Sequence, residues 1–221
     1  LGAELVDRLE RMRTDGSTLK VNLALSGRPR FTCLPEDRGQ FGPTIHLLPD
    51  EDVVLETLKA AHRDAMDGKL PEFPTIEWYF HTPIDASLKD DAGHENAALF
   101  VQWVPFTLAD GKRWDDVAPG YVAHLLSLCD RFAPGTSDLV VDTFTLPPPA
   151  IERHFGIHRG HIQHVDNRFG FTERPPHRFG PPGLYSGSAG THPAGGVSGA
   201  AGYNAAQACL EDLGIEPRLG A

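Results

Sequence analysis

The chain has 221 residues, which is enough for one large domain or two packed lobes, and its formal net charge is −10. This acidity argues against binding to nucleic acids or to anionic membranes, because both partners require a basic protein surface. No apolar run approaches the roughly 18 to 20 residues of a membrane-spanning helix, so a membrane span is not predicted.

The three cysteines, Cys33, Cys129 and Cys209, lie far apart and form no CxxC pair. They predict neither a disulfide framework nor a zinc site, and we expect small buried or half-buried side chains. This usage fits a reducing compartment best. The localisation we expect is the cytoplasm of a bacterium, or the mitochondrial matrix if the protein is eukaryotic.

The first part of the chain predicts two helices and three strands. Apolar residues at helical spacing predict a helix over Leu1–Met12, and Asp50 is expected to cap a helix that continues to Gly68. Alternating apolar and polar residues predict a half-buried strand over Leu19–Leu25, and further strands are expected at Thr44–Leu48 and Thr75–His81. The buried stripe of the second helix is expected to comprise Val54, Leu55, Leu58, Ala61 and Ala65.

The following segment repeats this alternation. Ala97–Phe106 is the most continuous apolar stretch and predicts a central strand, and Asp115 is expected to cap a helix over Val117–Phe132. Leu139–Leu146 predicts another strand, which the prolines Pro147–Pro149 end before a short helix begins. The pattern predicts an α+β fold with a mostly antiparallel or mixed sheet.

Two groups of side chains in these elements suggest binding. Trp78 and Phe80 could line an apolar substrate cavity, although consecutive aromatic residues on a strand are also commonly shared between core and surface. Histidines are concentrated between residues 154 and 164, but the intervening glycines argue against one continuous helix and no HExxH motif occurs. We therefore predict no metal site.

The segment from Gly183 to Asp212 combines a predicted short strand at Leu184–Tyr185, a glycine-rich turn and a helix expected from Val197 to near Gly214. A helix N-terminus presents unpaired N–H groups, so it favours a phosphate or the edge of a flavin that becomes anionic on reduction. The alternative is a glycine-rich helix that simply packs close to a sheet, since neither GxGxxG nor GxxxxGK[ST] occurs. Just before this segment, Arg174 and Arg178 are expected to pair with acids of the protein or with an anionic substrate.

The stretch THPAGGVSGAAGYNAA, from Thr191 to Ala206, resembles the C-terminal flavin-binding signature of the phytoene desaturase-like branch of the amine oxidase superfamily. IERHFGIHRGHIQHVDNRF and LKVNLALSGRPRFTCLP are similar to one subgroup of that branch, so the resemblance spans most of the chain. The chain has Ser188 and Ala194 where relatives usually carry glycine, and Tyr203 where they carry arginine. The resemblance implies FAD, and we place its contacts at Gly190, Thr191, Gly195, Gly196, Val197 and Ser198.

The resemblance also implies a division of labour. Residues 1–160 would form a substrate-binding lobe, in which Trp78 and Phe80 are substrate candidates. Residues 161–221 would form a crossover and the last strand–helix unit of an FAD-binding lobe, with His164 near the substrate. Relatives begin with a GxGxxG unit for FAD that does not occur in the chain, so we expect the C-terminal part of a longer enzyme that needs this missing N-terminal FAD-binding segment as a partner.

The function implied by the resemblance is FAD-dependent removal of hydride from a C–H bond of a small-molecule substrate, or the reverse reaction. The substrate is apolar or of unknown class, and the protein could form a homo-oligomer. No catalytic side chain is assigned. A second hypothesis is a non-catalytic binding or assembly module derived from the same fold, because the chain lacks the FAD pyrophosphate turn.

Overall fold

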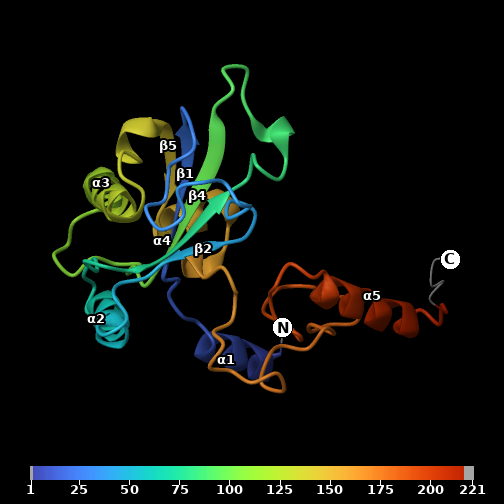
Figure 1. The fold of residues 1–221 in the computed structure, drawn as a ribbon. Coiled ribbons are helices and arrows are strands. Elements are labelled where there is room, and N and C mark those ends of the chain that lie inside the picture. Colours follow the sequence, from blue (N-terminus) through green and yellow to red (C-terminus); the bar gives the residue numbers. More distant parts are fainter. Residues whose placement is uncertain (1, 217–221) are drawn as a thin grey trace. The chain divides into compact units, whose positions relative to one another are not determined.

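The computed structural model describes residues 2–216. Residue 1 of the predicted first helix and residues 217–221 of the predicted C-terminal lobe lie outside the described residues. The chain forms two compact units (Figure 1). The sheet unit comprises Asp15–Gly160, and the loop unit comprises residues 2–14 together with residues 161–216. The predicted lobes, residues 1–160 and 161–221, stay predictions, and they differ from these units in that residues 2–14 belong with residues 161–216.

The sheet unit contains one antiparallel sheet and three α-helices. The strands are β1 (Thr18–Leu25), β2 (Ile45–Leu47), β3 (Thr75–Phe80), β4 (Glu95–Gln102) and β5 (Val140–Leu146), and the helices are α2 (Val54–Met66), α3 (Trp114–Phe132) and α4 (Pro148–Phe155). The strand order is β2-β3-β4-β1-β5, and each neighbouring pair is antiparallel. This arrangement confirms the predicted α+β fold class.

Strand β1 lies between β4 and β5 and pairs with both. Its register with β4 runs from Thr18 opposite Gln102 to Leu25 opposite Glu95. Because side chains alternate along a strand, every second residue of β1 faces the core. These residues are Leu19, Val21, Leu23 and Leu25, and each is at most 3% exposed. The polar residues Lys20 and Asn22 therefore project from the opposite face.

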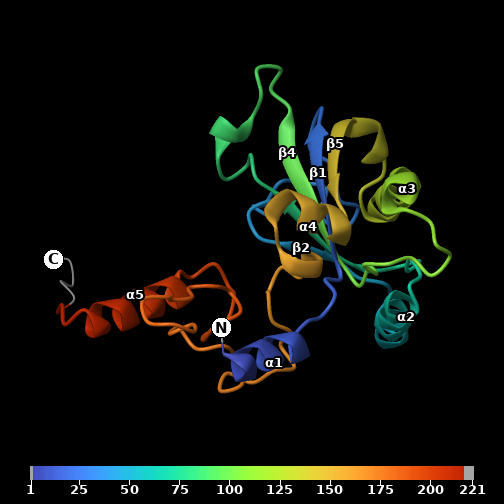
Figure 2. The ribbon, with the colours of Figure 1, turned by 180° about the vertical axis from the view of Figure 1, so that it is seen from behind.

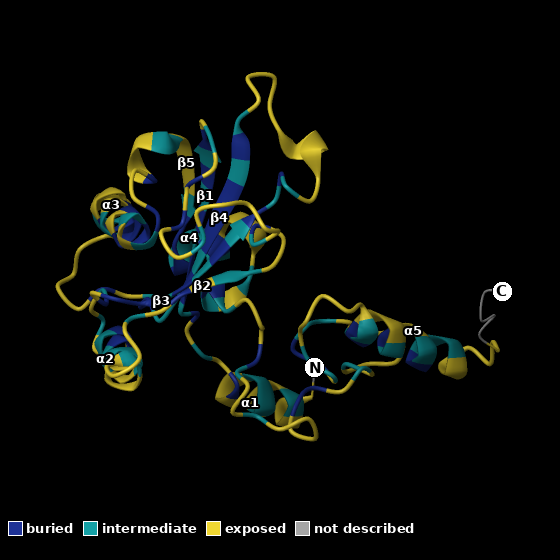
Figure 3. Cartoon of the chain, viewed as in Figure 1, coloured by how far each residue is buried: buried dark blue, intermediate teal, exposed yellow. Residues whose placement is uncertain are grey.

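The core lies against the face of the sheet that carries Leu19, Val21, Leu23 and Leu25, and α3 covers it. Seven residues of α3 are buried: Trp114, Tyr121, Val122, Leu125, Leu126, Leu128 and Cys129. They share one apolar cluster with the core-facing residues of β1, β3 and β4, and the buried strand positions stand out in Figure 3. Each fully buried leucine of this kind contributes about 2 kcal/mol to stability.

The other side of the sheet, which we call the open face, carries half-buried side chains. It includes Lys20 and Asn22 of β1, Glu77 and Tyr79 of β3, Phe100 of β4 and the exposed Phe144 of β5, and none of these belongs to the core cluster. Helix α4 covers part of this face, since the rings of His154 and Phe144 lie 6.0 Å apart. Figure 2, seen from behind, shows α4 in front of the strands.

Helix α2 differs from its prediction in its start and in its buried residues. Residues 51–53 form a turn, so the helix begins at Val54, and the Asp50 side chain does not cap it. Leu55 is 61% exposed, and only Ala61 and Ala65 are buried. The predicted stripe was too wide because a helix at the edge of the core buries only the narrow line that meets its neighbours.

Three other predictions also need correction. Strand β4 ends at Gln102 rather than near Phe106, because Trp103 has a φ of 68°, which extended backbone does not allow. Helix α3 begins at Trp114, so Asp115 lies in its first turn, where an acid still interacts favourably with the helix dipole. Cys33 is exposed, whereas Cys129 is buried, which raises the pKa of its thiol to about 12.

The loop unit contains helices α1 (Ala3–Arg11) and α5 (Ala200–Asp212). The predicted strand at Leu184–Tyr185 is reduced to a single antiparallel bridge between Tyr185 and Arg178. A strand requires a neighbour that satisfies its backbone groups along its length, and the described residues of this unit contain no other strand. None of the helices within residues 2–216 is long and apolar enough to cross a membrane.

The core assignment predicts that Leu99→Ala lowers the free energy of unfolding by about 3 kcal/mol, because Leu99 is completely buried in β4 and its truncation leaves a cavity. Urea unfolding followed by circular dichroism measures the change. The matched control is Leu55→Ala on α2, which should change stability by less than about 0.5 kcal/mol. Equal losses for the two variants would contradict the assigned burial.

Candidate cofactor loop and open sheet face

The glycine loop, residues 186–199, leads directly into α5. The helix begins at Ala200 and not at Val197 as predicted. Val197 and Gly199 have φ values of 56° and 72°, which a right-handed helix does not accept. The loop therefore extends three residues further toward the helix than the sequence pattern indicated.

The first part of the glycine loop is organised by Ser188. The Ser188 carbonyl oxygen accepts hydrogen bonds from the Thr191 backbone N–H at 2.9 Å and from Thr191 Oγ1 at 2.7 Å. The Gly190 N–H donates to Ser188 Oγ at 3.0 Å. The N–H groups of Gly190 and Thr191, two of the predicted flavin contacts, are thus engaged within the loop, and Thr191 is only 1% exposed.

The second part of the loop presents its backbone outward. Residues 195–199 are exposed, and within residues 2–216 the structure gives no hydrogen bond to the N–H groups of Gly195, Gly196, Val197 and Ser198. They directly precede the first turn of α5, in which the Ala200 N–H donates to Ser198 Oγ at 3.3 Å and the Tyr203 N–H donates to the Gly199 carbonyl at 2.9 Å. Such a set of donors favours a negatively charged or electron-rich partner.

The segment 164–174 packs against the glycine loop. His164 Nδ1 lies 2.7 Å from Ser188 Oγ, so the predicted substrate candidate His164 does lie beside the predicted cofactor loop. A Cβ on residue 190 would lie only 3.0 Å from Val165 Cγ2, so glycine allows the two segments to approach this closely. Arg174, only 4% exposed, donates to the Gly190 carbonyl at 3.5 Å and to Asn167 Oδ1 at 3.1 Å.

The two residues of the bridge, Arg178 and Tyr185, bind the C-terminal end of α5 through ion pairs and a hydrogen bond. Arg178 Nη2 lies 2.9 Å from carboxylate oxygens of both Glu211 and Asp212, as the salt-bridge interpretation of this arginine predicted. The Tyr185 hydroxyl donates to Asp212 Oδ2 at 2.8 Å. This hydrogen bond is the main reason why the pKa of Tyr185 rises to about 12.

Trp78 and Phe80 lie in the sheet unit, on the core face of β3. They are 0% and 3% exposed. Their rings pack against Phe31 and Phe41, with centroids 5.5 Å apart for Phe31 and Trp78 and 4.9 Å for Phe41 and Phe80. The side chain of Tyr79, which lies between them in the sequence, is on the open face of the sheet. A substrate-lining role for Trp78 and Phe80 stays a prediction, and their observed surroundings are those of core residues.

The histidines between residues 154 and 164 do not converge. His154 packs against Phe155 with ring centroids 4.6 Å apart, and His158 Nδ1 lies 3.9 Å from Glu152. In the described part of the chain, no group of three or more His, Cys, Asp or Glu side chains is arranged to hold a metal ion.

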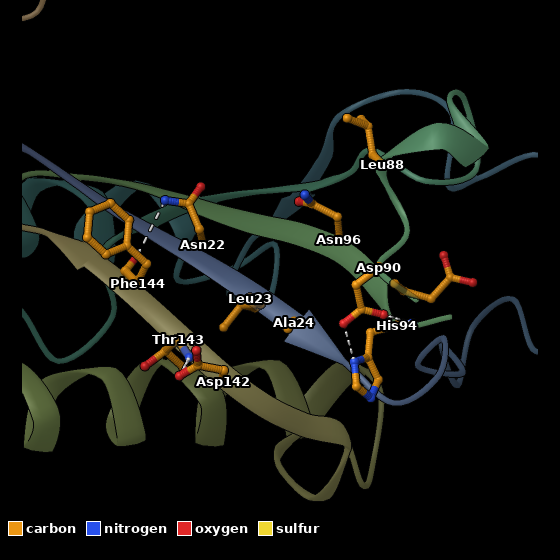
Figure 4. A pocket seen from close by; sticks show the side chains of 11 residues that line it. Asn22, Leu23, Ala24, Leu88, Asp90, His94, Asn96, Asp142, Thr143 and Phe144 are labelled. Carbon is orange, nitrogen blue, oxygen red and sulfur yellow. Dashed lines mark hydrogen bonds and ion pairs between the residues drawn. The ribbon is translucent and has the colours of Figure 1, made fainter. Parts of the chain in front are cut away.

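A cavity of about 250 Å³ lies beside the C-terminal half of β1 (Figure 4). Strands β1, β4 and β5 contribute Asn22, Asn96 and Phe144 to its lining, and the loop before β4 contributes Asp90 and His94. Asn22 Nδ2 donates to the Phe144 carbonyl at 3.3 Å. His94 Nδ1 lies 2.7 Å from Asp90 Oδ2, and hydrogen bonds from the His94 backbone and ring lower the pKa of Asp90.

The open face also carries two charged residues, Lys20 and Glu77, that we did not predict as a site. Glu77 accepts hydrogen bonds from Gln102 Nε2 at 2.8 Å and from the Tyr79 hydroxyl. Lys20 Nζ lies 5.3 Å from the centroid of the Tyr79 ring. Burial lowers the pKa of Lys20, and the neighbouring Glu77 opposes that shift. The available signal was the polar position 20 within the alternating stretch LKVNLAL.

Comparison with known proteins relates nearly the whole chain to proteins that are named for an oxidoreductase domain, while no protein-family model matches it. The chain is 33% identical over 225 residues to pyridine nucleotide-disulfide oxidoreductase domain-containing protein 2 of Rattus norvegicus. It is 31% identical over 226 residues to the protein of the same name from Mus musculus. Each match covers 96% of the chain, which spans 38% of the length of these curated relatives.

The packing of the loop on α5 predicts that Gly187→Ala is destabilising, because the new Cβ would lie 3.0 Å from Gly202 Cα. We expect a cost of roughly 1–3 kcal/mol, measured as faster amide hydrogen exchange in α5. Gly195→Ala is the control, since a Cβ there meets no atom within 4 Å. Unchanged exchange in the Gly187 variant would contradict the close contact.

The anchoring of Tyr185 predicts a pH titration. Asp212→Asn removes the negative charge that disfavours the phenolate, so the pKa of Tyr185 should fall from about 12 toward its ordinary value near 10. Absorbance of ionised tyrosine against pH measures this shift, and subtraction of the curve of the Tyr185→Phe variant identifies the signal. A pKa that does not move would exclude the hydrogen bond as its cause.

Proposed function

We propose that the chain is the C-terminal part of an FAD-dependent oxidoreductase of the phytoene desaturase-like type. The observation that carries this proposal is the similarity along 96% of the chain to two proteins that are named for an oxidoreductase domain. The stretch from Thr191 to Ala206, with its resemblance to a flavin-binding signature, narrows the proposal to FAD.

The glycine loop fits the requirements of such a cofactor. Gly195, Gly196, Val197 and Ser198 present backbone N–H groups without partners in residues 2–216, at the N-terminal end of α5. These groups would hold the electron-rich edge or a phosphate of the cofactor. Gly190 and Thr191 would shape the loop through their bonds to Ser188, and their own N–H groups are already in use.

In this proposal each unit has one task. Bound FAD would supply the redox chemistry by accepting hydride from a substrate C–H bond. The loop unit would orient the cofactor and stabilise negative charge on it through the backbone donors, and the sheet unit would bind the substrate. We assign no side chain of the chain as acid or base.

The proposal predicts that the full-length protein retains FAD after desalting, whereas the chain of residues 1–221 alone does not, because the loop supplies only part of the cofactor's contacts. Absorbance and fluorescence of retained flavin measure the outcome. If the full-length protein also fails to retain FAD, the flavoenzyme proposal is wrong, and the non-catalytic binding or assembly module becomes the better explanation.

A charge placed in the loop tests which residues make the contact. In the full-length protein, Ser198→Glu should weaken FAD retention about tenfold or more, because the carboxylate competes with the cofactor for the same N–H donors. It should not weaken α5, since an acid favours a helix N-terminus. Gln207→Glu, further along α5, is the control with the same added charge. Equal retention in both variants would remove the glycine loop from the cofactor site.

A further inference from the structure

Lys20 is a half-buried cation whose two neighbours across the sheet are apolar, with Glu77 and His81 near enough to interact with it electrostatically. In the register of the sheet it lies opposite Phe100 of β4 on one side and Leu146 of β5 on the other. Its ammonium group lies over the ring of Tyr79. Within residues 2–216 the structure gives Lys20 Nζ no hydrogen bond and no ion pair. Partial burial of an ammonium group without an acceptor is unfavourable, and an acceptor from a ligand would offset this cost.

The nearby carboxylate is not arranged to serve as that acceptor. Both oxygens of Glu77 accept hydrogen bonds from neutral donors, Oε1 from Gln102 and Oε2 from Tyr79. Glu77 therefore influences Lys20 through the electrostatic field alone. The negative charge of Glu77 repels every anion on this part of the sheet, and it repels a doubly charged ligand about twice as strongly as a singly charged one.

Space for the rest of a ligand lies on the same face. Asn22 follows Lys20 by two residues, so the two side chains project in the same direction about 7 Å apart. Asn22 lines the cavity of about 250 Å³ together with Phe144 and Asn96. Figure 4 shows Asn22 and Phe144 on the same side of the strands and joined by their hydrogen bond. A small organic molecule can thus extend from Lys20 toward an aromatic and amide-lined cavity.

We propose that the open face binds a small organic monocarboxylate, whose carboxylate pairs with Lys20 and whose body lies against Phe100 and Phe144 toward the cavity. The proposal rests on the proposed function only where it calls this ligand the substrate. It adds a substrate class to that function, namely a carboxylic acid with an apolar or aromatic body.

The test uses the chain of residues 1–221 and the probe 3-phenylpropanoate, with the neutral 3-phenylpropanamide as its isostere. Binding is followed by two-dimensional NMR, in which the amide signals of β1 and β4 around Lys20 and Phe100 report the site. We expect the carboxylate to bind at least about tenfold more tightly than the amide, because a hydrogen bond to a charged group is replaced by one to a neutral group.

Three variants identify the cation. Lys20→Gln should weaken binding of the carboxylate about tenfold, and Lys20→Arg, which keeps the charge, should restore most of the affinity. Lys59→Gln removes an exposed lysine of α2 that pairs with Glu56, and should leave binding unchanged. The dispersion of the NMR spectrum shows that each variant is folded.

The proposal is overturned if the amide binds as tightly as the carboxylate, if Lys20→Gln binds as the parent chain does, or if phenyl phosphate binds more tightly than 3-phenylpropanoate. FAD retention by the full-length protein is a separate readout. If the protein retains FAD but does not bind the carboxylate, only the proposed substrate class is wrong. If it binds the carboxylate but the full-length protein does not retain FAD, only the flavoenzyme proposal is wrong.

Discussion

The antiparallel pairing of β1 with β4 is the constraint on which the sheet unit depends. A shift of this register by one residue would turn Leu19, Val21 and Leu23 away from α3 and bring Lys20 and Asn22 into the core. Burying an unpaired ammonium group there would cost far more than any contact on the open face could return. The apolar residues of one face therefore determine where the polar residues of the other face lie.

In the loop unit, too, a well-bonded segment supports an exposed one. Arg8 donates to the backbone carbonyls of Glu173 and Arg174 at 2.9 and 2.7 Å, and Arg174 in turn donates to Gly190. The hydroxyl and carbonyl groups of Ser188 hold the first part of the loop. These contacts fix residues 186–191, so that residues 195–199 can present their N–H groups without bonding to one another.

The strands of the fold could be predicted largely from the sequence, because the alternation in LKVNLAL directly reflects which residues are buried and TIEWYF is rich in the aromatic and branched residues that favour strands. The prediction failed where burial depends on distant neighbours, as for Leu55, which has the right helical spacing but nothing to cover it. It failed also at Val197, where a positive φ delays the helix although valine gives no sign of it. The glycine loop could be recognised in the sequence as a motif. The sequence did not show that its unbonded backbone N–H donors are confined to residues 195–198, because this depends on the hydrogen bonds that Ser188 makes with Gly190 and Thr191. Lys20 was hidden because its isolation results from the pairing of Glu77 with two other strand residues.

The position of β1 in the sheet also has a consequence for biosynthesis. This strand leaves the ribosome first among the five strands, yet its neighbours are β4 and β5, so that residue 25 must wait for residue 95 and residue 20 for residue 146. Until then its apolar residues have no partner, and strands in that state adhere readily to one another. A nascent chain therefore carries an unprotected hydrophobic segment at least until residues 95–102 have been synthesised, and chaperones bind segments of this kind.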